Sequence, residues 1–257
     1  MSLRQPANNG VGNVEQAGLP ESSDIARKRR GLLDLARYAS ERRNHISHTN
    51  ITCDQLSDPA LYIQLPFPFV GLAVPTRFEI DPGDNEDNWF FMGRERFAEL
   101  LKTLEHVRRR RNLTTLWVYG SKGYGKSHLL AALVCYLTSQ KERVVYIPDC
   151  RECLKDPVSY VRTAMLFAWG DDKIMQREIN TLDTQDKITK FFTELCRHGD
   201  AVFVIDQLNA LAELEEDGYT SRNKKGNIFN WLQACRSNSI SILSSAANYK
   251  AYIETLY

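Results

Sequence analysis

Residues 120–127 read Gly-Ser-Lys-Gly-Tyr-Gly-Lys-Ser and match the pattern G-x-x-x-x-G-K-[ST] at every fixed position. Before them, residues 113–119 (Leu-Thr-Thr-Leu-Trp-Val-Tyr) are rich in β-branched and aromatic side chains, which is typical of a buried strand. After them, residues 127–137 are rich in Ala and Leu, which favours a helix. A strand, a glycine loop and a helix in this order direct backbone N–H groups and the positive end of the helix dipole at one anion. The stretch therefore predicts a phosphate-binding loop.

Each position of this loop has its own role in holding a nucleoside triphosphate. Gly120, Gly123 and Gly125 would adopt positive φ angles and let the backbone approach a phosphate without a Cβ in the way. Lys126 would lie across the β- and γ-phosphates, and the Ser127 hydroxyl would bind Mg²⁺. A glycine turn beside an exposed lysine is the alternative, and the fitting strand and helix argue against it. The other expected nucleotide contacts are Ser121, Lys122, Tyr124 and His128.

A second signature lies downstream, where residues 201–206 read Ala-Val-Phe-Val-Ile-Asp. A continuous apolar run is typical of a parallel strand covered on both faces, and the carboxylate at its end would face the site. Asp206 is therefore the second predicted magnesium ligand beside Ser127, acting through water. An apolar strand that ends in aspartate is common, so the preceding phosphate loop is what favours a functional role.

The residue after Asp206 departs from the pattern of many hydrolytic proteins with this loop, which carry a glutamate there to polarise the attacking water. Gln207 cannot accept a proton, but it can orient a water molecule. We therefore expect slow hydrolysis, with Lys126, Asp206 and Gln207 as catalytic residues. A glutamate among residues 213–216 could substitute, although such a charge run is usually a solvated face.

Upstream of the loop, residues 91–95 read Phe-Met-Gly-Arg-Glu and begin a helix-like pattern. This stretch resembles the segment that precedes the phosphate loop and touches the adenine in AAA+ and STAND ATPases. An amphipathic helix start with a glycine cap is the alternative. The resemblance covers roughly residues 89–248. It implies a three-layer α/β/α fold with a mainly parallel sheet, ATP and Mg²⁺ as cofactors, and nucleotide contacts from Gly93 and Arg94.

Two further strands are predicted at residues 143–147 and 239–245. In the ATPases that this chain resembles, the second of them lies between the phosphate-loop strand and the strand that carries the acid. It ends there in a polar sensor of the γ-phosphate. The resemblance favours Asn248 for this catalytic role, with Ser244 or Ser245 as alternatives.

A narrower resemblance rests on four segments taken together, residues 119–130, 146–150, 164–169 and 205–210. They look like the ATPase module of Crinkler-type and retrotransposon-hot-spot-type proteins. This similarity implies a nucleotide-driven effector that acts in a nucleus.

The length and composition predict one main domain with an N-terminal extension. The 257 residues, 43% of them hydrophobic and 25% charged, suffice for a full core. We expect a disordered tail at residues 1–24, a helix and a proline-broken strap at 25–88, and the NTPase domain at 89–257. Relatives usually continue into a fifth strand and a helical lid. Because few residues follow the last predicted strand, we expect both to be missing.

The charge distribution bears on possible partners. A net charge of +1 gives no overall electrostatic case for nucleic acid. The basic cluster Arg27, Lys28, Arg29 and Arg30 could be a nuclear address, a contact to a phosphate backbone, or a solvated helix start. We therefore expect a nucleoside triphosphate as ligand, with a nucleic acid, a protein or a second copy of the chain as possible partners.

The cysteines and the hydropathy bear on the compartment. Among six cysteines only Cys150 and Cys153 are close together, and no further pair completes a zinc site. This favours free thiols in a reducing, intracellular compartment. The sequence holds no apolar run of about 18 residues, so no membrane partner is expected.

Three classes of function remain open from the sequence. The first is a slow ATPase. The second is a non-hydrolysing nucleotide-binding switch or scaffold, which Gln207 favours. The third is a small-molecule kinase, which is less favoured because no arginine-rich lid is visible. A GTPase is disfavoured because residues 223–226, Asn-Lys-Lys-Gly, lack the acid of a guanine-reading N-K-x-D.

Overall fold

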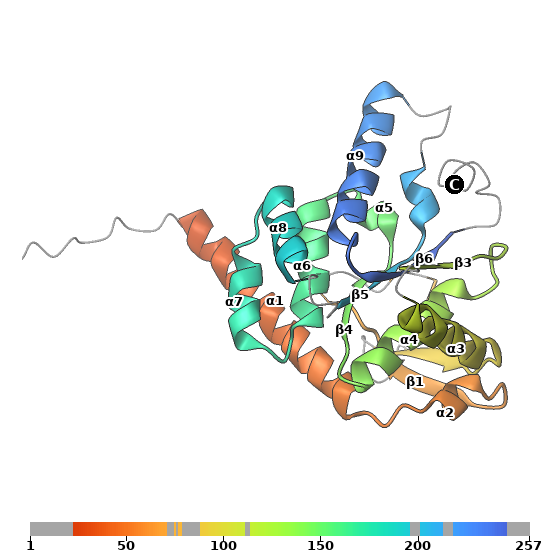
Figure 1. Ribbon diagram of the computed structural model, residues 1–257. Helices are drawn as coiled ribbons and strands as arrows, with labels where there is room; N and C mark the ends of the chain where they lie inside the picture. The colour runs from red at the N-terminus through yellow and green to blue at the C-terminus, as the bar shows by residue number, and fades with distance from the viewer. Residues whose placement is uncertain are drawn as a thin grey trace, which may run out of the picture.

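Four parallel strands form the central sheet of the computed structural model, which describes residues 23–70, 75, 77–78, 88–110, 114–195, 201–212 and 218–245. The strands are β3 (Thr115–Val118), β4 (Arg143–Ile147), β5 (Ala201–Ile205) and β6 (Ile240–Ser244). Their order across the sheet is β3-β6-β5-β4 (Figure 1). All four strands were predicted, and β6 lies between β3 and β5 as the resemblance implied.

Helices cover both faces of this sheet. They are α3 (Arg96–Arg109), α4 (Lys126–Ser139), α6 (Pro157–Ala168), α8 (Gln185–Leu195) and α9 (Tyr219–Cys235). The first two lie on one face and the other three on the opposite face (Figure 1). Because a parallel sheet needs both faces covered, its strands are apolar, and every residue of β5 is buried. The predicted three-layer α/β/α fold with a parallel sheet is confirmed.

Aspartates begin three of the helices on the β4 side of the fold. Asp149, Asp156 and Asp172 each accept a hydrogen bond from a backbone N–H in the first turn, which satisfies a donor that the helix leaves unpaired. The capped helices are α5 (Cys150–Cys153), α6 and α7 (Lys173–Asn180). A short 3-10 helix, η2 (Leu208–Leu211), follows β5 in the same way that α5 follows β4.

Helix α1 (Ser23–His48) packs against α6 and α4 (Figure 1). Its Arg43 is fully buried, and the Nε atom donates to Asp171 Oδ1 at 2.9 Å. Arg43 Nη2 donates to the carbonyl oxygen of Glu142 at 3.2 Å. A buried guanidinium is stable only with such acceptors, so α1 belongs to the same core. The predicted tail at residues 1–24 lies almost wholly outside the described residues and stays a prediction.

A separate two-stranded antiparallel sheet is formed by residues on both sides of the predicted domain boundary. Strands β1 (Tyr62–Pro66) and β2 (Asn88–Met92) pair along their full length, and α2 (Cys53–Ser57) leads into β1. Trp89 and Phe91 of β2 are fully buried. Pro66 is the last residue of β1, a position at which the missing N–H of proline does not interrupt the strand. The sequence predicted an extended strap and a boundary near residue 88, but it did not indicate this pairing, which joins the two segments.

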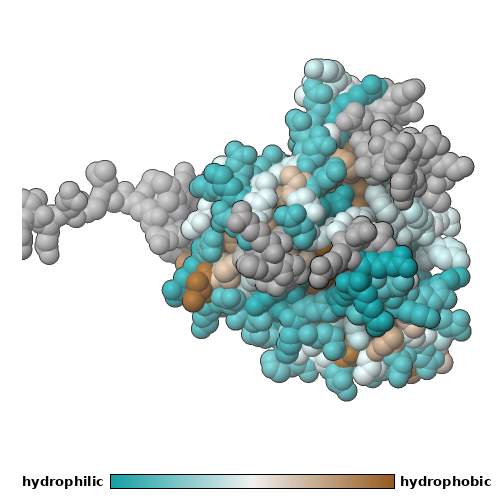
Figure 2. Space-filling model, viewed as in Figure 1, coloured by the Kyte–Doolittle hydropathy of each residue, from teal (hydrophilic) through white to brown (hydrophobic). Residues whose placement is uncertain are grey.

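The surface contrasts with this apolar interior. The face seen in Figure 2 is mostly hydrophilic, with small and separate hydrophobic patches. No helix among the described residues is long and apolar enough to span a membrane. Many large aromatic side chains lie in the core, among them Phe67, Trp89, Phe97, Phe167, Phe192 and Phe203.

Candidate functional site

A pocket lies at the edge of the sheet where β3, β5 and β6 end. Parallel strands present their carboxyl ends at one edge, so the loop after β3 and the residues after β5 and β6 meet there. The cavity has a volume of about 690 Å³. Most of the predicted site residues line it together. The lining residues are Arg77, Lys122, Gly123, Tyr124, Gly125, Lys126, Ser127, His128, Arg151, Asp206, Gln207, Asn209, Ser244 and Ser245.

Two of the three loop glycines have the backbone conformation that the motif requires. Gly123 has a φ of 87° and Gly125 a φ of 72°, a region that other residues rarely adopt. Gly125 also begins α4, so the N-terminal end of this helix faces the pocket. Gly120 is not among the residues with positive φ, so the prediction of such an angle there was wrong. A Cβ at Gly120 would make only ordinary contact with Tyr124, at 3.6 Å.

The predicted phosphate ligands follow the loop directly. The Nζ atom of Lys126 donates to the carbonyl oxygens of Gly120 and Ser121 at 2.7 and 2.9 Å. These bonds hold the ammonium group over the loop, where phosphate oxygens could replace the carbonyls as acceptors. Ser127 is half-buried in the first turn of α4 and lines the pocket. The ring of His128 lines the pocket too and contacts the rings of two buried residues, Phe78 at 4.8 Å and Trp89 at 5.6 Å.

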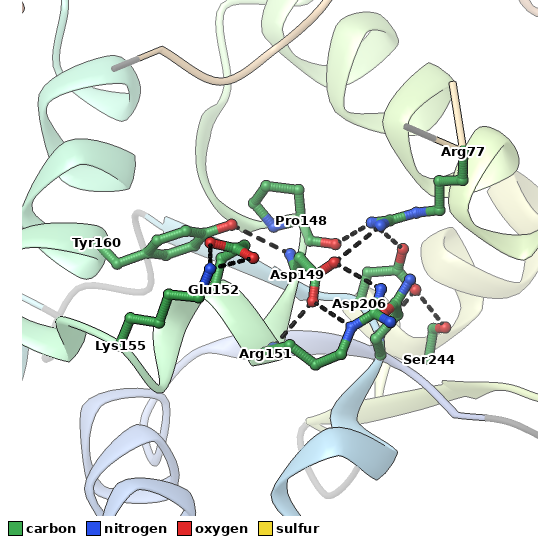
Figure 3. Close-up of polar contacts among 10 residues, drawn as sticks. Arg77, Pro148, Asp149, Arg151, Glu152, Lys155, Tyr160, Asp206 and Ser244 are labelled. Atoms are coloured by element: carbon green, nitrogen blue, oxygen red, sulfur yellow. Dashed lines mark hydrogen bonds and ion pairs between the residues drawn. The ribbon is translucent and has the colours of Figure 1, made fainter. Parts of the chain in front are cut away.

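Asp206 is almost fully buried and its two oxygens have different partners (Figure 3). Oδ1 accepts hydrogen bonds from Ser244 Oγ at 2.6 Å and from the backbone N of Gln207 at 2.8 Å. Oδ2 faces the guanidinium of Arg77, with Nη2 at 3.3 Å. Ser244 of β6 and the backbone of Gln207 thus hold the carboxylate in one orientation, and its second oxygen is paired with Arg77.

A second buried carboxylate, Asp149, lies beside Asp206 and was not among the predicted site residues. Asp149 Oδ2 accepts from Arg77 Nη1 at 3.0 Å and from Arg151 Nη2 at 2.9 Å (Figure 3). Arg77 Nη2 also donates to the carbonyl oxygen of Pro148. Burial by itself would raise the pKa of Asp149, but hydrogen bonds from Arg151 and the positive charges of Arg77 and Arg151 outweigh it and lower the pKa. Asp149 is therefore a charged carboxylate.

A signal for Asp149 was present in the sequence. It follows β4 as Asp206 follows β5, and paired strands of a parallel sheet end side by side. For Arg77 there was no such signal, because it lies 129 residues before Asp206 and outside any motif.

The upstream motif at residues 91–95 contacts the phosphate loop outside the pocket. Arg94 Nη1 donates to the carbonyl oxygen of Tyr124 at 2.9 Å, and a Cβ on Gly125 would lie 2.0 Å from this atom. Gly93 packs against the end of α2, where a Cβ would lie 2.1 Å from the carbonyl oxygen of Asp58. Neither Gly93 nor Arg94 is among the residues that line the pocket. Their predicted nucleotide contacts remain predictions.

Some of the remaining predicted residues line the pocket, and the others lie outside the part of the chain that the structure describes. Gln207 lines the pocket and has a φ of 57°, a left-handed conformation that is uncommon for glutamine. Ser244 and Ser245 also line it. Asn248 and the glutamates at residues 213–216 lie outside the described residues.

The residues present fit a magnesium ion. Mg²⁺ prefers oxygen ligands, and the Ser127 hydroxyl and Asp206 carboxylate are oxygen donors of one pocket.

The cysteines of α5 do not form a metal site of another kind. Burial raises the pKa of the Cys153 thiol to about 12 and that of Cys150 well above its usual value, which keeps both protonated. Among the described residues, no group of three or more His, Cys, Asp or Glu side chains could hold a metal.

The comparison with protein families agrees with this geometry. The model of the family described as novel STAND NTPase 1 matches residues 68–247, which is more than half of the chain. The chain belongs to this family. The match begins before Arg77 and ends beyond β6, so it includes the phosphate loop, Asp149 and Asp206 of this STAND NTPase. A comparison with curated proteins gave no match.

Proposed function

We propose that this STAND NTPase binds ATP with Mg²⁺ in the pocket between the phosphate loop and Asp206, and hydrolyses the nucleotide slowly. The observation that carries this proposal is the meeting of Lys126, Ser127 and Asp206 in one cavity behind a glycine loop of positive φ. Ser127 and Asp206 would hold the metal, and bound Mg²⁺ would neutralise charge on the β- and γ-phosphates.

The low turnover follows from the acids of the site. Among the described residues that line the pocket, Asp206 is the one carboxylate, and we assign it to the metal. Gln207 and Asn209 can orient a water molecule but cannot take its proton. Hydrolysis would then depend on positioning and charge stabilisation without a free carboxylate as general base.

The decisive test is nucleotide binding by the intact chain and two loop variants. At about 100 times the dissociation constant, Mg·ATP should add roughly 2.7 kcal/mol of apparent stability in a thermal shift assay. Lys126→Ala should weaken ATP binding by at least about tenfold, the size of one charge-assisted hydrogen bond to phosphate. Lys122→Ala is the matched control. It removes an exposed positive charge from the same pocket but keeps the backbone N–H of residue 122, through which the loop would contact phosphate, so it should retain most of the affinity.

Each outcome decides between the candidates. ATP binding that Lys126→Ala leaves unchanged would overturn the proposed site. Phosphate release no faster than in the Lys126→Ala variant would replace slow hydrolysis with the binding-only switch that Gln207 also permits. Parallel titrations with GTP and ADP test the choice of base and phosphate number.

The wider role is also a proposal. The similarity to Crinkler-type modules supports an effector-like protein that acts on a nucleic acid or protein partner. The basic residues 27–30 support a nuclear location. Unchanged nuclear accumulation of a tagged chain after neutralisation of these four residues would contradict that address.

A further inference from the structure

Arg77 reaches the site from a part of the chain outside every motif of the NTPase. Its neighbour Phe78 is 2% exposed and packs against the rings of Phe67, Trp89 and His128 at centroid distances of 4.8, 5.2 and 4.8 Å. The Phe78 backbone N also donates to the carbonyl oxygen of Pro75 at 2.9 Å. Because Phe78 is fixed in the core, the backbone of Arg77 is fixed beside the pocket.

The guanidinium of Arg77 bridges three acceptors that belong to two strand ends. Nη1 bonds Asp149, and Nη2 bonds both the carbonyl oxygen of Pro148 and Asp206 Oδ2 (Figure 3). The two carboxylates are 5% and 1% exposed, so solvent screens these ion pairs little. A planar fork of donors suits such bridging, whereas an ammonium acts as a single point of charge.

The position of Arg77 on Asp206 matters for the metal. Asp206 Oδ1 already accepts hydrogen bonds from Ser244 and Gln207. This leaves Oδ2, the oxygen that is paired with Arg77, as the one that a metal would approach. A divalent cation beside the same oxygen, bound directly or through a water molecule, would repel the guanidinium at short range. Arg77 would keep its bonds to Asp149 and Pro148 if it left Asp206, so release costs one of three contacts.

On the basis of the proposed function, we propose that Arg77 is a built-in competitor of the metal. In the nucleotide-free protein it pairs with the metal-binding side of Asp206, and it must give up this contact when Mg²⁺ enters with the nucleotide. Arg77 therefore lowers the advantage that Mg²⁺ gives to nucleotide binding. It sets how strongly occupancy of the site depends on the metal.

Removal of the guanidinium should uncover this competition. We expect Arg77→Gln to raise the ratio of the ATP dissociation constant in EDTA to that in excess Mg²⁺ by about tenfold, measured by titration calorimetry. Arg151→Gln is the matched control because Arg151 lines the same pocket and bonds Asp149, but no Asp206 bond to it is seen among the described contacts. In this control the ratio should stay within about twofold of the wild-type value.

The control also separates the proposal from a general charge effect. An unchanged ratio in Arg77→Gln, or equal increases in both variants, would overturn the competition. If Arg77→Gln does not fold, Arg77→Met serves, because it keeps an apolar stem beside Phe78 and removes the positive charge from Asp206, so it should also raise the ratio. An unchanged ratio in Arg77→Met would then overturn the proposal.

Metal binding without nucleotide keeps this proposal distinct from the proposed function. Mn²⁺ alone, followed by electron paramagnetic resonance, should bind Arg77→Gln more tightly than the wild-type protein, and equal binding would contradict the competition. Failure of the wild-type chain to bind any nucleoside triphosphate, with or without Mg²⁺, would instead overturn the proposed function itself.

Discussion

Ser244 is a single residue that the sheet positions against the site carboxylate Asp206. The pairing of Ile205 with Leu243 brings the end of β6 beside Asp206, and the Ser244 hydroxyl donates to the carboxylate at 2.6 Å. A hydrogen bond to a buried charge contributes about 1.5–3 kcal/mol. We therefore expect Ser244→Ala to lower the free energy of unfolding by about 2 kcal/mol in urea denaturation.

Ser241 provides the comparison on the same strand. It is equally buried, but its hydroxyl donates to the carbonyl oxygen of Ser239 at 3.5 Å, a long contact between neutral groups. Ser241→Ala should lower the free energy of unfolding by about 1 kcal/mol or less. Equal decreases in the free energy of unfolding of the two variants would show that the bond to Asp206 stabilises the fold no more than a bond between neutral groups.

Gln207 is the other residue whose local geometry stands out. Its φ of 57° costs a residue with a Cβ about 1–2 kcal/mol relative to a right-handed conformation. The backbone N of Gln207 donates to Asp206 in this conformation, and its side chain lines the pocket. The fold therefore maintains a strained backbone at the position that would orient water.

At the scale of elements, Gly93 joins β2, α2 and α3. An added Cβ would lie 2.1 Å from the carbonyl oxygen of Asp58, so the end of α2 must move to admit it. Overpacking of this kind costs about 1–3 kcal/mol. We expect Gly93→Ala to lower the free energy of unfolding by about 2 kcal/mol and to weaken ATP binding, because the adjacent Arg94 supports the loop at Tyr124.

The control for this substitution should change stability in the opposite direction. Gly31 lies in α1 with nothing within 4 Å of an added Cβ. Gly31→Ala should therefore raise the free energy of unfolding by about 0.5–1 kcal/mol, since glycine is unfavourable inside a helix. Destabilisation by both variants would contradict the steric reason given for Gly93.

Across the molecule as a whole, ion pairs connect segments far apart in the sequence. Asp171 joins Arg43 of α1 to Arg143 of β4. Burial would raise the pKa of Asp171, but the charges of Arg43 and Arg143 and their hydrogen bonds outweigh it and lower the pKa. Asp149 has a lowered pKa at the site for the same kind of reason.

These lowered pKa values predict acid sensitivity. The unfolded chain has the ordinary value of 3.8, so below that pH it binds protons that the folded protein does not. The stability that these carboxylates contribute is therefore complete above pH 3.8 and is lost as the pH falls through their folded pKa values. Urea denaturation at a series of pH values should show this decline.

Asp171→Asn tests the assignment. The variant should be less stable than the wild-type protein near neutral pH, because Arg43 is fully buried and loses its counter-ion. It should also lose less of its remaining stability in acid, because one of the titrating carboxylates is gone. A wild-type acid response in Asp171→Asn would assign the pH dependence to other groups.

Local sequence pattern was sufficient to predict the phosphate loop, the four sheet strands and the acid after β5. Each depends on neighbouring residues: glycines where φ is positive at 123 and 125, apolar runs where strands are buried, and one carboxylate at a strand end. The resemblance to known ATPases added the place of β6 between its neighbours.

The residues around that acid were not predictable from local pattern, because they come from distant parts of the chain. Arg77 and Asp206 are 129 residues apart, and their contact depends on how β1, β2 and the buried Phe78 are packed. The pairing of β1 with β2 and the contact of Gly93 with α2 are long-range in the same way. Local patterns report backbone conformation and burial, whereas an ion pair between distant segments is set by the path of the whole chain.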